Sequence, residues 1–330
     1  MNIQQDFDRI AEWMRLQARL HYSLTEDELI TRRKEWFQRS LTTLTQRERD
    51  YWFQDSVPTR EQDLRSLPVR TPNDLLQTQE LAPPFGLFND RPGALIKCSS
   101  GTTGQRKRWP RTWPQWQELC IGNHRQLVAM GVQPGDAIMT TEIGKMQQGN
   151  QVMEDPAALY EGVLKVQCIK AHITDQLNHI ERYGVNVISG IPHTLLLWAK
   201  RWHTVSLQRP LRAVATTGAP LTHEDRQRLC EAFDVERIYD HYGSSEMSNI
   251  WWTCAEGARH VNVDLMWIDN DHCTDTSVIS SYCGLPYYRY SLQERIDMQP
   301  SECACGSALP ICTTFTQPDK ADSFNWQIKG

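Results

Sequence analysis

The sequence predicts an α/β protein in which helices flank a mostly parallel sheet and a small β-rich subdomain follows. Two observations carry this prediction. Short apolar runs alternate with helical segments between about residues 91 and 250, and the helical signal fades from about Trp251 onward. Strands that alternate with helices at this spacing are typical of parallel sheets. We therefore expect a helical N-terminal region (1–90), an α/β core (91–250) and a β-rich subdomain (251–330).

The individual elements follow from hydrophobic periodicity and from start and stop signals. Apolar residues recur at helical spacing near residues 10–20 and 27–40, and Thr71-Pro72 marks a helix start. Thr222, with Asp225 three residues later, is typical of a helix N-terminus. The remaining predicted helices cover 116–130, 173–183, 192–202 and 223–233. The predicted strands cover 94–98, 137–140, 164–169, 186–189, 211–216, 235–239, 261–264, 276–282 and 287–292.

Composition excludes several classes of protein. At 330 residues the chain has room for about two domains at ~150 residues each. Lys and Arg number 35 against 40 Asp and Glu, so the net charge of -5 argues against a protein that coats nucleic acid. No apolar run is long enough for a membrane span, and acidic residues interrupt the first twenty positions, which argues against a secretory signal. Ten cysteines without such a signal favour a reducing cytoplasm.

The most informative segment is the hydroxyl-rich turn at residues 99–104, Ser-Ser-Gly-Thr-Thr-Gly, which follows a predicted strand. Its glycines allow backbone N–H groups to converge on an anion, and its hydroxyls supply further donors to phosphate. Cations follow at Arg106, Lys107, Arg108 and Arg111. The glycine spacing excludes a Walker A loop. An ordinary polar turn followed by a solvated basic run is the alternative interpretation.

Two further turns follow predicted strands. The first is Gly218-Ala219-Pro220, and the second is the run Asp240-His241-Tyr242-Gly243-Ser244-Ser245-Glu246. Tyr242 can stack on a purine, and Glu246 offers the oxygen ligand that Mg²⁺ prefers. Asp240 can accept a hydrogen bond from an adenine amino group. Each feature alone also suits a simple strand-end turn. Because the carboxyl ends of parallel strands meet at one edge, we expect the three turns to form one nucleotide site.

Together these motifs resemble the acyl-adenylate-forming (ANL) superfamily, and within it the phenylacetate-CoA ligase-like group. Residues 99–104 resemble that family's phosphate loop, 218–220 its adenine-side loop and 242–246 its Tyr-Gly-x-Ser/Thr-Glu motif. Leu285-Pro286-Tyr287-Tyr288-Arg289-Tyr290 resembles the segment before the ribose-binding motif, and Cys303-Ala304-Cys305-Gly306 resembles a Cys-x-Cys-Gly element of the group. The resemblance implies an ANL-type large N-terminal domain.

The resemblance also implies a reaction, in which a carboxylate attacks the α-phosphorus of Mg-ATP to give an acyl-adenylate and pyrophosphate. Such chemistry depends on positioning and charge neutralisation. The implied catalytic residues are Thr102, Lys107, Ser245 and Glu246, with Glu246 holding Mg²⁺. The implied nucleotide-binding residues are Ser99, Ser100, Gly101, Thr102, Thr103, Gly104, Gly218, Ala219, Pro220, Asp240, His241, Tyr242, Gly243, Ser244, Ser245 and Glu294. The acceptor would be the thiol of CoA or of a carrier protein.

The sequence departs from the family pattern at three places. Glu294 stands where an Asp usually binds the ribose, and Gln105 stands where a Lys usually follows the phosphate loop. Residues 322–330 resemble the hinge before a small C-terminal domain that the chain lacks. We therefore expect weak catalysis, or catalysis that depends on a partner supplying that domain. A non-catalytic carrier of an aryl acid or its adenylate is the alternative, and a homodimer is possible.

The expected substrate is an aromatic carboxylic acid. The short outline resembles the shortened adenylating proteins of phenazine antibiotic biosynthesis, which implies a planar acid and a role in secondary metabolism. Residues that can line a flat slot are Met146, Gln147, Ile191, Pro192, Trp198, Gly218 and Met247. Ordinary core packing of the same apolar side chains is the alternative.

Four residues can form a zinc site. Cys254, His260, Cys303 and Cys305 supply the Cys₃His donor set of many tetrahedral zinc sites. The Cys-x-Cys spacing is tighter than the common Cys-x₂-Cys, so free cytosolic thiols remain the alternative.

Overall fold

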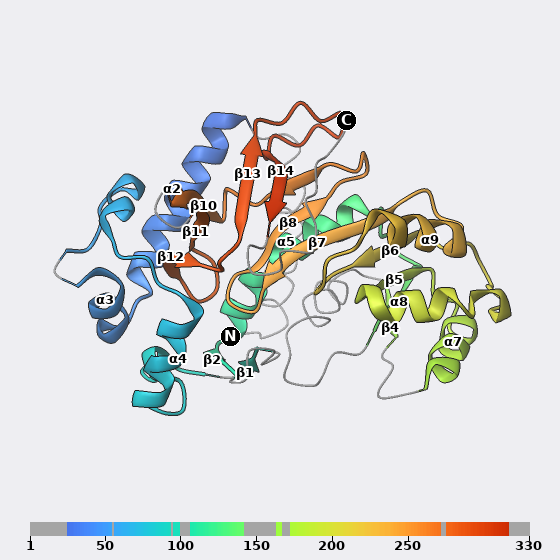
Figure 1. The fold of residues 1–330 in the computed structure, drawn as a ribbon, viewed down its shortest axis with the longest axis horizontal. Coiled ribbons are helices and arrows are strands. Elements are labelled where there is room, and N and C mark those ends of the chain that lie inside the picture. The colour runs from blue at the N-terminus through green and yellow to red at the C-terminus, as the bar shows by residue number, and fades with distance from the viewer. Residues whose placement is uncertain are drawn as a thin grey trace, which may run out of the picture.

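The computed structural model describes residues 25–54, 56–93, 95–99, 106–141, 163–166, 172–271 and 275–316. A nine-stranded mixed sheet runs through the molecule in the order β13-β14-β9-β8-β7-β6-β5-β3-β4 (Figure 1). One half is parallel: β3 (Ala137–Thr140), β4 (Leu164–Val166), β5 (Val187–Gly190), β6 (Ala213–Thr216) and β7 (Ile238–Ser244). The predicted α/β fold with a mostly parallel core is therefore confirmed.

The other half of this sheet is antiparallel. It consists of β8 (Ser248–Thr253), β9 (Arg259–Val261), β13 (Arg295–Gln299) and β14 (Ile311–Thr316). A separate three-stranded sheet contains β10 (Met266–Asp271), β11 (Thr276–Ser281) and β12 (Tyr287–Ser291). The predicted boundary at residue 250 thus falls within β8, and the nine-stranded sheet continues across it. The domain limits themselves stay predictions.

Helices cover the two ends of the sheet differently. At the parallel end lie α7 (Ile173–Arg182), α8 (Pro192–Ala199) and α9 (His223–Phe233), which share a hydrophobic core with β3, β5 and β6 (Figure 1). At the other end, α2 (Glu26–Thr42), α3 (Gln46–Phe53) and α4 (Pro72–Leu81) lie beside β10–β12. The long helix α5 (Trp113–Ala129) packs against β8. Short 3₁₀ helices lie at Glu61–Ser66, Gly86–Phe88 and Trp202–Thr204.

Helix starts follow the predicted capping chemistry. Thr71 caps α4, in which Pro72 occupies the first turn, and Thr112 caps α5 in the same way. The hydroxyl of Thr222 accepts a hydrogen bond from the backbone N–H of Asp225 at 2.9 Å, which fixes the start of α9. The predicted helix at 10–20 and the hinge-like segment at 322–330 lie outside the described residues.

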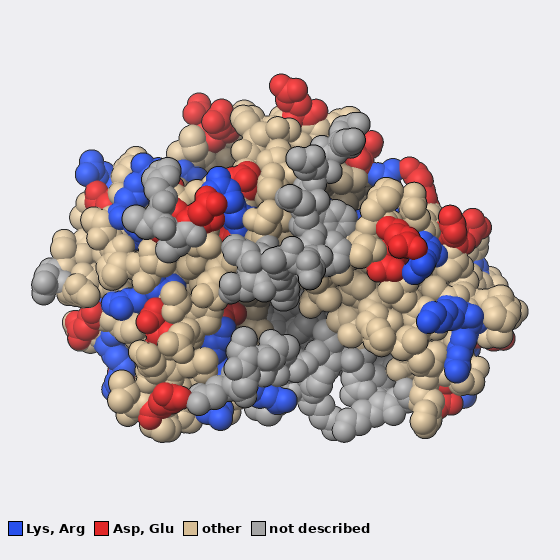
Figure 2. All heavy atoms as spheres, in the orientation of Figure 1, with Lys and Arg blue, Asp and Glu red and all other residues tan. Residues whose placement is uncertain are grey.

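Two surface findings bear on partners. No helix in the described part of the chain is long and apolar enough to cross a bilayer. On the face shown in Figure 2, acidic and basic side chains of the described residues are interspersed.

Candidate functional site

Two of the three predicted turns, the Gly218 turn and the segment from Asp240, lie together at the carboxyl edge of the parallel strands. β5 ends at Gly190 and leads into Ile191, β6 ends at Thr216 before the Gly218 turn, and β7 continues through Tyr242. β6 pairs with β7 only as far as Thr216 and Asp240. From residue 241 onward, β7 still pairs with β8 on one edge, whereas its other edge faces the Gly218 turn. The local topology is what brings the two turns together.

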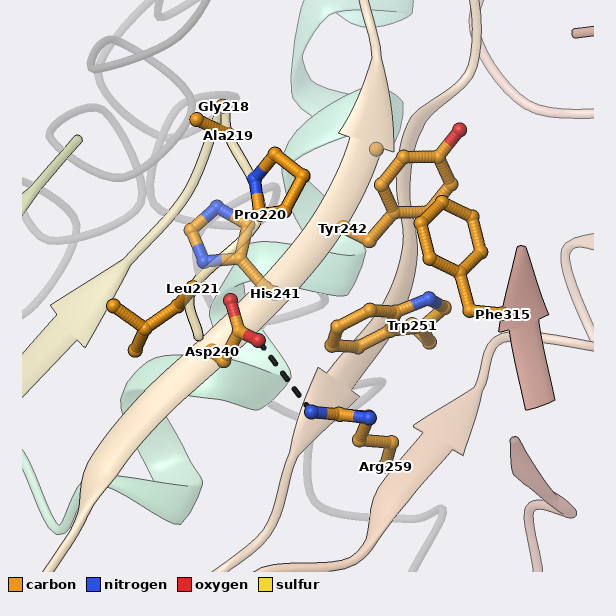
Figure 3. A pocket seen from close by; sticks show the side chains of 11 residues that line it. Gly218, Ala219, Pro220, Leu221, Asp240, His241, Tyr242, Trp251, Arg259 and Phe315 are labelled. Carbon is orange, nitrogen blue, oxygen red and sulfur yellow. Dashed lines mark ion pairs between the residues drawn. The ribbon is translucent and has the colours of Figure 1, made fainter. Parts of the chain in front are cut away.

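A cavity of about 120 Å³ lies between these two turns (Figure 3). Gly218, whose φ of +79° suits glycine, belongs to the turn that forms one side of the cavity. The lining residues are Gly218, Ala219, Pro220, Leu221, Asp240, His241, Tyr242, Gly243, Trp251, Arg259 and Phe315. Two of the three predicted turns thus share one hollow.

An aromatic wall closes one side of the cavity. The ring centroids of Tyr242 and Phe315 are 4.5 Å apart, and those of Tyr242 and Trp251 are 5.9 Å apart. The Arg259 guanidinium lies 5.0 Å from the centroid of the Trp251 ring. In the view of Figure 3 the three aromatic rings lie on one side of β7, and the Gly218 turn lies on the other side. A flat ring can stack on such a surface.

Asp240 is held in place by its neighbours. Its carboxylate accepts hydrogen bonds from the Thr216 hydroxyl at 3.1 Å and from the Arg226 guanidinium at 3.2 Å. Arg259 forms an ion pair with it at 3.8 Å (Figure 3). Burial raises the pKa of the Asp240 carboxyl, and the two guanidiniums oppose that effect. This rigid carboxylate fits the predicted role of accepting from an exocyclic amino group at the cavity edge.

His241 is buried at 4% exposure, yet neither ring nitrogen has a hydrogen-bond partner among the described residues. Burial lowers the pKa of the imidazole to about 4, so the ring is neutral near pH 7. Buried polar groups in proteins nearly always have a partner. An unsatisfied imidazole that lines a cavity is therefore a feature that calls for an explanation.

A charged cluster lies just after Tyr242. Glu246, which is 3% exposed, forms an ion pair with Lys107, and Tyr290 donates a hydrogen bond to the same carboxylate oxygen, Oε1, at 3.0 Å. Among the described residues, the other oxygen, Oε2, has no partner. Burial and the nearby Glu246 raise the pKa of Tyr290. A carboxylate with one free oxygen fits the hard oxygen ligation of Mg²⁺.

Lys107 links this cluster to the predicted phosphate loop. The strands on either side of this loop, β1 (Leu95–Cys98) and β2 (Arg108–Arg111), pair antiparallel, and the Lys107 N–H donates to the Ser99 hydroxyl at 3.0 Å. Arg111 is buried and donates to the Ser245 carbonyl at 2.6 Å. Burial lowers the pKa of Arg111 to about 10. Two members of the basic run, Lys107 and Arg111, therefore contact the 242–246 segment.

Part of the predicted site lies outside the described residues, namely Ser100, Gly101, Thr102, Thr103, Gly104, Met146 and Gln147. Of the predicted acid slot, Ile191 lies beside the cavity, because its Cγ2 would be 3.3 Å from a β-carbon at Gly218. Pro192 is buried at the start of α8.

Three predicted contacts differ in the structure. Met247 is fully buried in the main hydrophobic core, so it does not line the slot, and Trp198 is likewise a core residue. Both side chains are fully buried among other core residues, so neither reaches the cavity. Glu294 does not line the cavity, and its backbone carbonyl accepts from the Ser277 N–H at 2.6 Å. The Ser244 hydroxyl accepts from the Met247 N–H at 3.1 Å.

Sequence reasoning missed Leu221, Trp251, Arg259 and Phe315 as lining residues. Leu221 directly follows a predicted turn, so its neighbourhood was recognisable. Trp251, Arg259 and Phe315 belong to β8, β9 and β14, which antiparallel pairing brings beside β7. No motif in the sequence marks that pairing.

The four predicted zinc ligands come together on the antiparallel half of the sheet. The donor atoms of Cys254, His260, Cys303 and Cys305 all lie within 4.8 Å of one another. The Cys254 and Cys303 sulfurs are 3.6 Å apart, and the Cys305 sulfur is 3.2 Å from His260 Nε2. Zn–S bonds of about 2.3 Å in a tetrahedron place sulfurs about 3.8 Å apart, so the spacing fits zinc.

The chain resembles known proteins in its fold. No protein-family profile and no curated protein sequence matches the chain. A crystal structure of 2-hydroxyisobutyryl-CoA ligase in an open conformation with 2-HIB-AMP and CoA superposes with a TM-score of 0.73 at 16% identity, covering 87% of this chain and 73% of that chain. The same ligase in its postadenylation state gives 0.72 at 15% identity over 90% and 71%. Its thioesterification state gives 0.72 at 16% over 88% and 68%.

At this level of identity the likeness establishes the fold. The superposition covers most of this chain. The chain therefore has the α/β fold of the large N-terminal domain of adenylate-forming ligases.

Proposed function

We propose that this protein activates an aromatic carboxylic acid by ATP-dependent adenylation. The observation that carries the proposal is the shared cavity between the Gly218 turn and the Asp240–Gly243 segment, with the Glu246 carboxylate three residues further along the chain. The position of this cavity at the carboxyl ends of parallel strands is where ligands bind in α/β sheets. The fold neighbour, which is described with an acyl-adenylate, supports the same reaction class.

The adenine ring would lie between the Gly218 turn and Tyr242. The Gly218-Ala219-Pro220 backbone and the Tyr242 ring both line the cavity, so each would offer a contact surface to the base. The fixed Asp240 carboxylate can accept a hydrogen bond from the adenine amino group. These contacts position the nucleotide and leave the phosphates directed toward Glu246 and Lys107.

The charged cluster would serve the phosphates. Magnesium, when bound, neutralises phosphate charge during attack at the α-phosphorus. Glu246 Oε2 is available as its ligand, while Oε1 stays anchored by Tyr290. Lys107 sits at the exit of the hairpin that contains the predicted phosphate loop, so its ammonium can move from Glu246 to a phosphate oxygen. Thr102, Thr103 and Ser245 are the proposed hydroxyl donors.

The acid would occupy the neighbouring strand edge near Ile191 and Gly218. Ile191, whose Cγ2 lies beside Gly218, would offer an apolar contact to an aromatic ring, as in secondary-metabolite acids such as phenazine carboxylates. We propose a thiol, of CoA or of a carrier protein, as the acceptor in a second step, with turnover that is slow or dependent on a partner.

Pyrophosphate–ATP exchange tests the proposal. Purified protein with Mg-ATP is assayed against benzoate, phenylacetate, phenazine-1-carboxylate and, as an aliphatic comparison, 2-hydroxyisobutyrate. We expect exchange that depends on an aromatic acid. Exchange with none of these acids, or with the aliphatic acid alone, would contradict aromatic adenylation.

We further propose that the Cys254, His260, Cys303 and Cys305 cluster binds a structural zinc ion. Leu309 accepts a hydrogen bond from His260 Nδ1 at 2.7 Å, which leaves the Nε2 lone pair directed at the thiols. Such a carbonyl partner typically orients a histidine ligand. The four donors fill a tetrahedron and leave no open position, so the ion would connect β8 and β9 to the 303–309 loop rather than take part in the reaction.

A further inference from the structure

His241 is the buried imidazole that lines the cavity. Its neighbours on β7 have roles that the contacts explain: Asp240 pairs with Arg226 and Arg259, and Tyr242 stacks with Phe315. His241 makes no hydrogen bond through either nitrogen among the described residues, although it is 4% exposed. An unsatisfied buried polar group costs about 1–3 kcal/mol, so such a group is retained where a ligand completes it.

The position of His241 indicates which part of the ligand it meets. In Figure 3 the His241 ring lies on the side of β7 that carries the Gly218 turn, whereas the Tyr242 ring lies on the other side. His241 lines the cavity together with the Gly218 turn, beyond the point where β6 stops pairing with β7. Ile191 approaches that turn from the next strand. His241 therefore belongs to the acid end of the site.

The charge state of the His241 ring limits which ligand group it can bind. Burial lowers the pKa of His241 to about 4, so the neutral ring cannot act as a cation for the carboxylate of the acid. A neutral imidazole presents one N–H donor and one nitrogen acceptor. A hydroxyl group can donate to the free nitrogen or accept from the N–H, so it satisfies the ring in either tautomer.

We propose that His241 is a specificity-determining residue that hydrogen-bonds a hydroxyl substituent on the aromatic ring of the acid. The proposal rests on the proposed adenylation of an aromatic acid and adds the class of that acid. An acid without the hydroxyl leaves the imidazole unsatisfied, and a site built for a hydrogen bond discriminates strongly against such an analogue. We expect at least about a 10-fold preference in kcat/KM for the hydroxylated member of a matched pair.

The test uses matched pairs of acids in the exchange assay. The pairs are benzoate with its 2-, 3- and 4-hydroxy derivatives, phenylacetate with its hydroxy derivatives, and phenazine-1-carboxylate with 6-hydroxyphenazine-1-carboxylate. Each is assayed with the native protein, with His241→Phe, with His241→Asn and with the exposed control His203→Phe. The ratio of kcat/KM within a pair is the readout, because it does not depend on the fraction of folded protein.

The expected result is a preference for a hydroxylated acid that falls to about 3-fold or less in His241→Phe. His241→Asn, which keeps a donor and an acceptor, should retain part of it, and His203→Phe should retain all of it. The inference is overturned if no pair shows a preference, if His241→Phe keeps it, or if His241→Phe changes only the KM for ATP. Exchange with unsubstituted acids but no preference refutes this inference alone, whereas no exchange with any acid refutes the proposed function and the inference with it.

Discussion

The cavity, which lies where the parallel and antiparallel halves of the sheet meet, and the Cys/His cluster on the antiparallel half are assembled in opposite ways. In the cavity, polar groups line a hollow and the His241 nitrogens stay unsatisfied within the described residues. In the cluster, four donors converge on one point, and a backbone carbonyl fixes the tautomer of His260. The first arrangement suits a planar ligand that comes and goes, and the second suits an ion that stays.

The two regions contribute differently to the stability of the protein and to its function. A hollow lined by unpaired groups reduces stability, and the ligand repays that cost on binding. A closed metal site adds stability to the strands that it connects. Substitutions in the cavity should therefore change exchange kinetics, and substitutions in the cluster should change unfolding.

The largest effect is expected at Glu246. Glu246→Gln removes the proposed magnesium ligand and the charged partner of Lys107. The rate of acid-dependent pyrophosphate–ATP exchange should therefore fall by about 10²-fold or more. The measurement is the exchange rate at saturating Mg-ATP. The exposed Glu231→Gln is the control and should be unaffected. An exchange rate in Glu246→Gln within 2-fold of the native protein would exclude a role for this carboxylate.

The next effect concerns the cluster. Cys305→Ser should lower bound zinc from about one ion per chain to near zero and lower Tm by about 5 °C or more, since loss of a metal is among the largest destabilising changes. Zinc is measured by atomic absorption and Tm by calorimetry. The control is Cys230→Ser, because Cys230 lies outside the cluster. A native protein purified without zinc that cannot be loaded with it would contradict the metal site.

Tyr242→Leu tests the aromatic wall. Stacking on a base is worth about 1–3 kcal/mol, so the KM for ATP should rise about 10-fold while zinc content and Tm stay close to native. Exchange kinetics at varied ATP give the KM, and the exposed Tyr183→Leu serves as the control. An unchanged KM for ATP would mean that adenine does not contact this ring.

The smallest effect is expected at Thr222, which caps α9 immediately after the Gly218 turn. Thr222→Ala removes the hydrogen bond to the Asp225 N–H and should lower the free energy of unfolding by about 1 kcal/mol. Urea unfolding gives the value, and Thr222→Ser, which keeps the hydroxyl, should restore most of it. A loss of zinc in Thr222→Ala would show that the two halves of the sheet are not independent.

Much of the fold could be predicted because the local signals are strong. Thr71-Pro72 and Thr222 mark helix starts correctly, and the strands predicted at 137–140 and 211–216 correspond to the parallel strands Ala137–Thr140 and Ala213–Thr216. The turns at Gly218 and Tyr242 could be assigned to one site, since parallel strands end at one edge. The sequence also predicted the Cys/His cluster from its donor types, although 49 residues separate Cys254 from Cys303.

The rest depends on long-range pairing that leaves no local signal. Nothing near Phe315 or Arg259 indicates that β14 and β9 extend the same sheet as β7. Met247 was predicted in the acid slot, but it lies in the turn between β7 and β8, where its side chain is fully buried in the core. The unsatisfied state of His241 depends on its three-dimensional surroundings and has no sequence signature.

The most direct test is a crystal structure of the protein with AMP. We expect the adenine ring to lie between the Gly218-Ala219-Pro220 turn and the Tyr242 side chain, with its amino group toward Asp240. AMP bound at another place on the molecule, or a cavity that stays empty at millimolar AMP, would contradict this expectation.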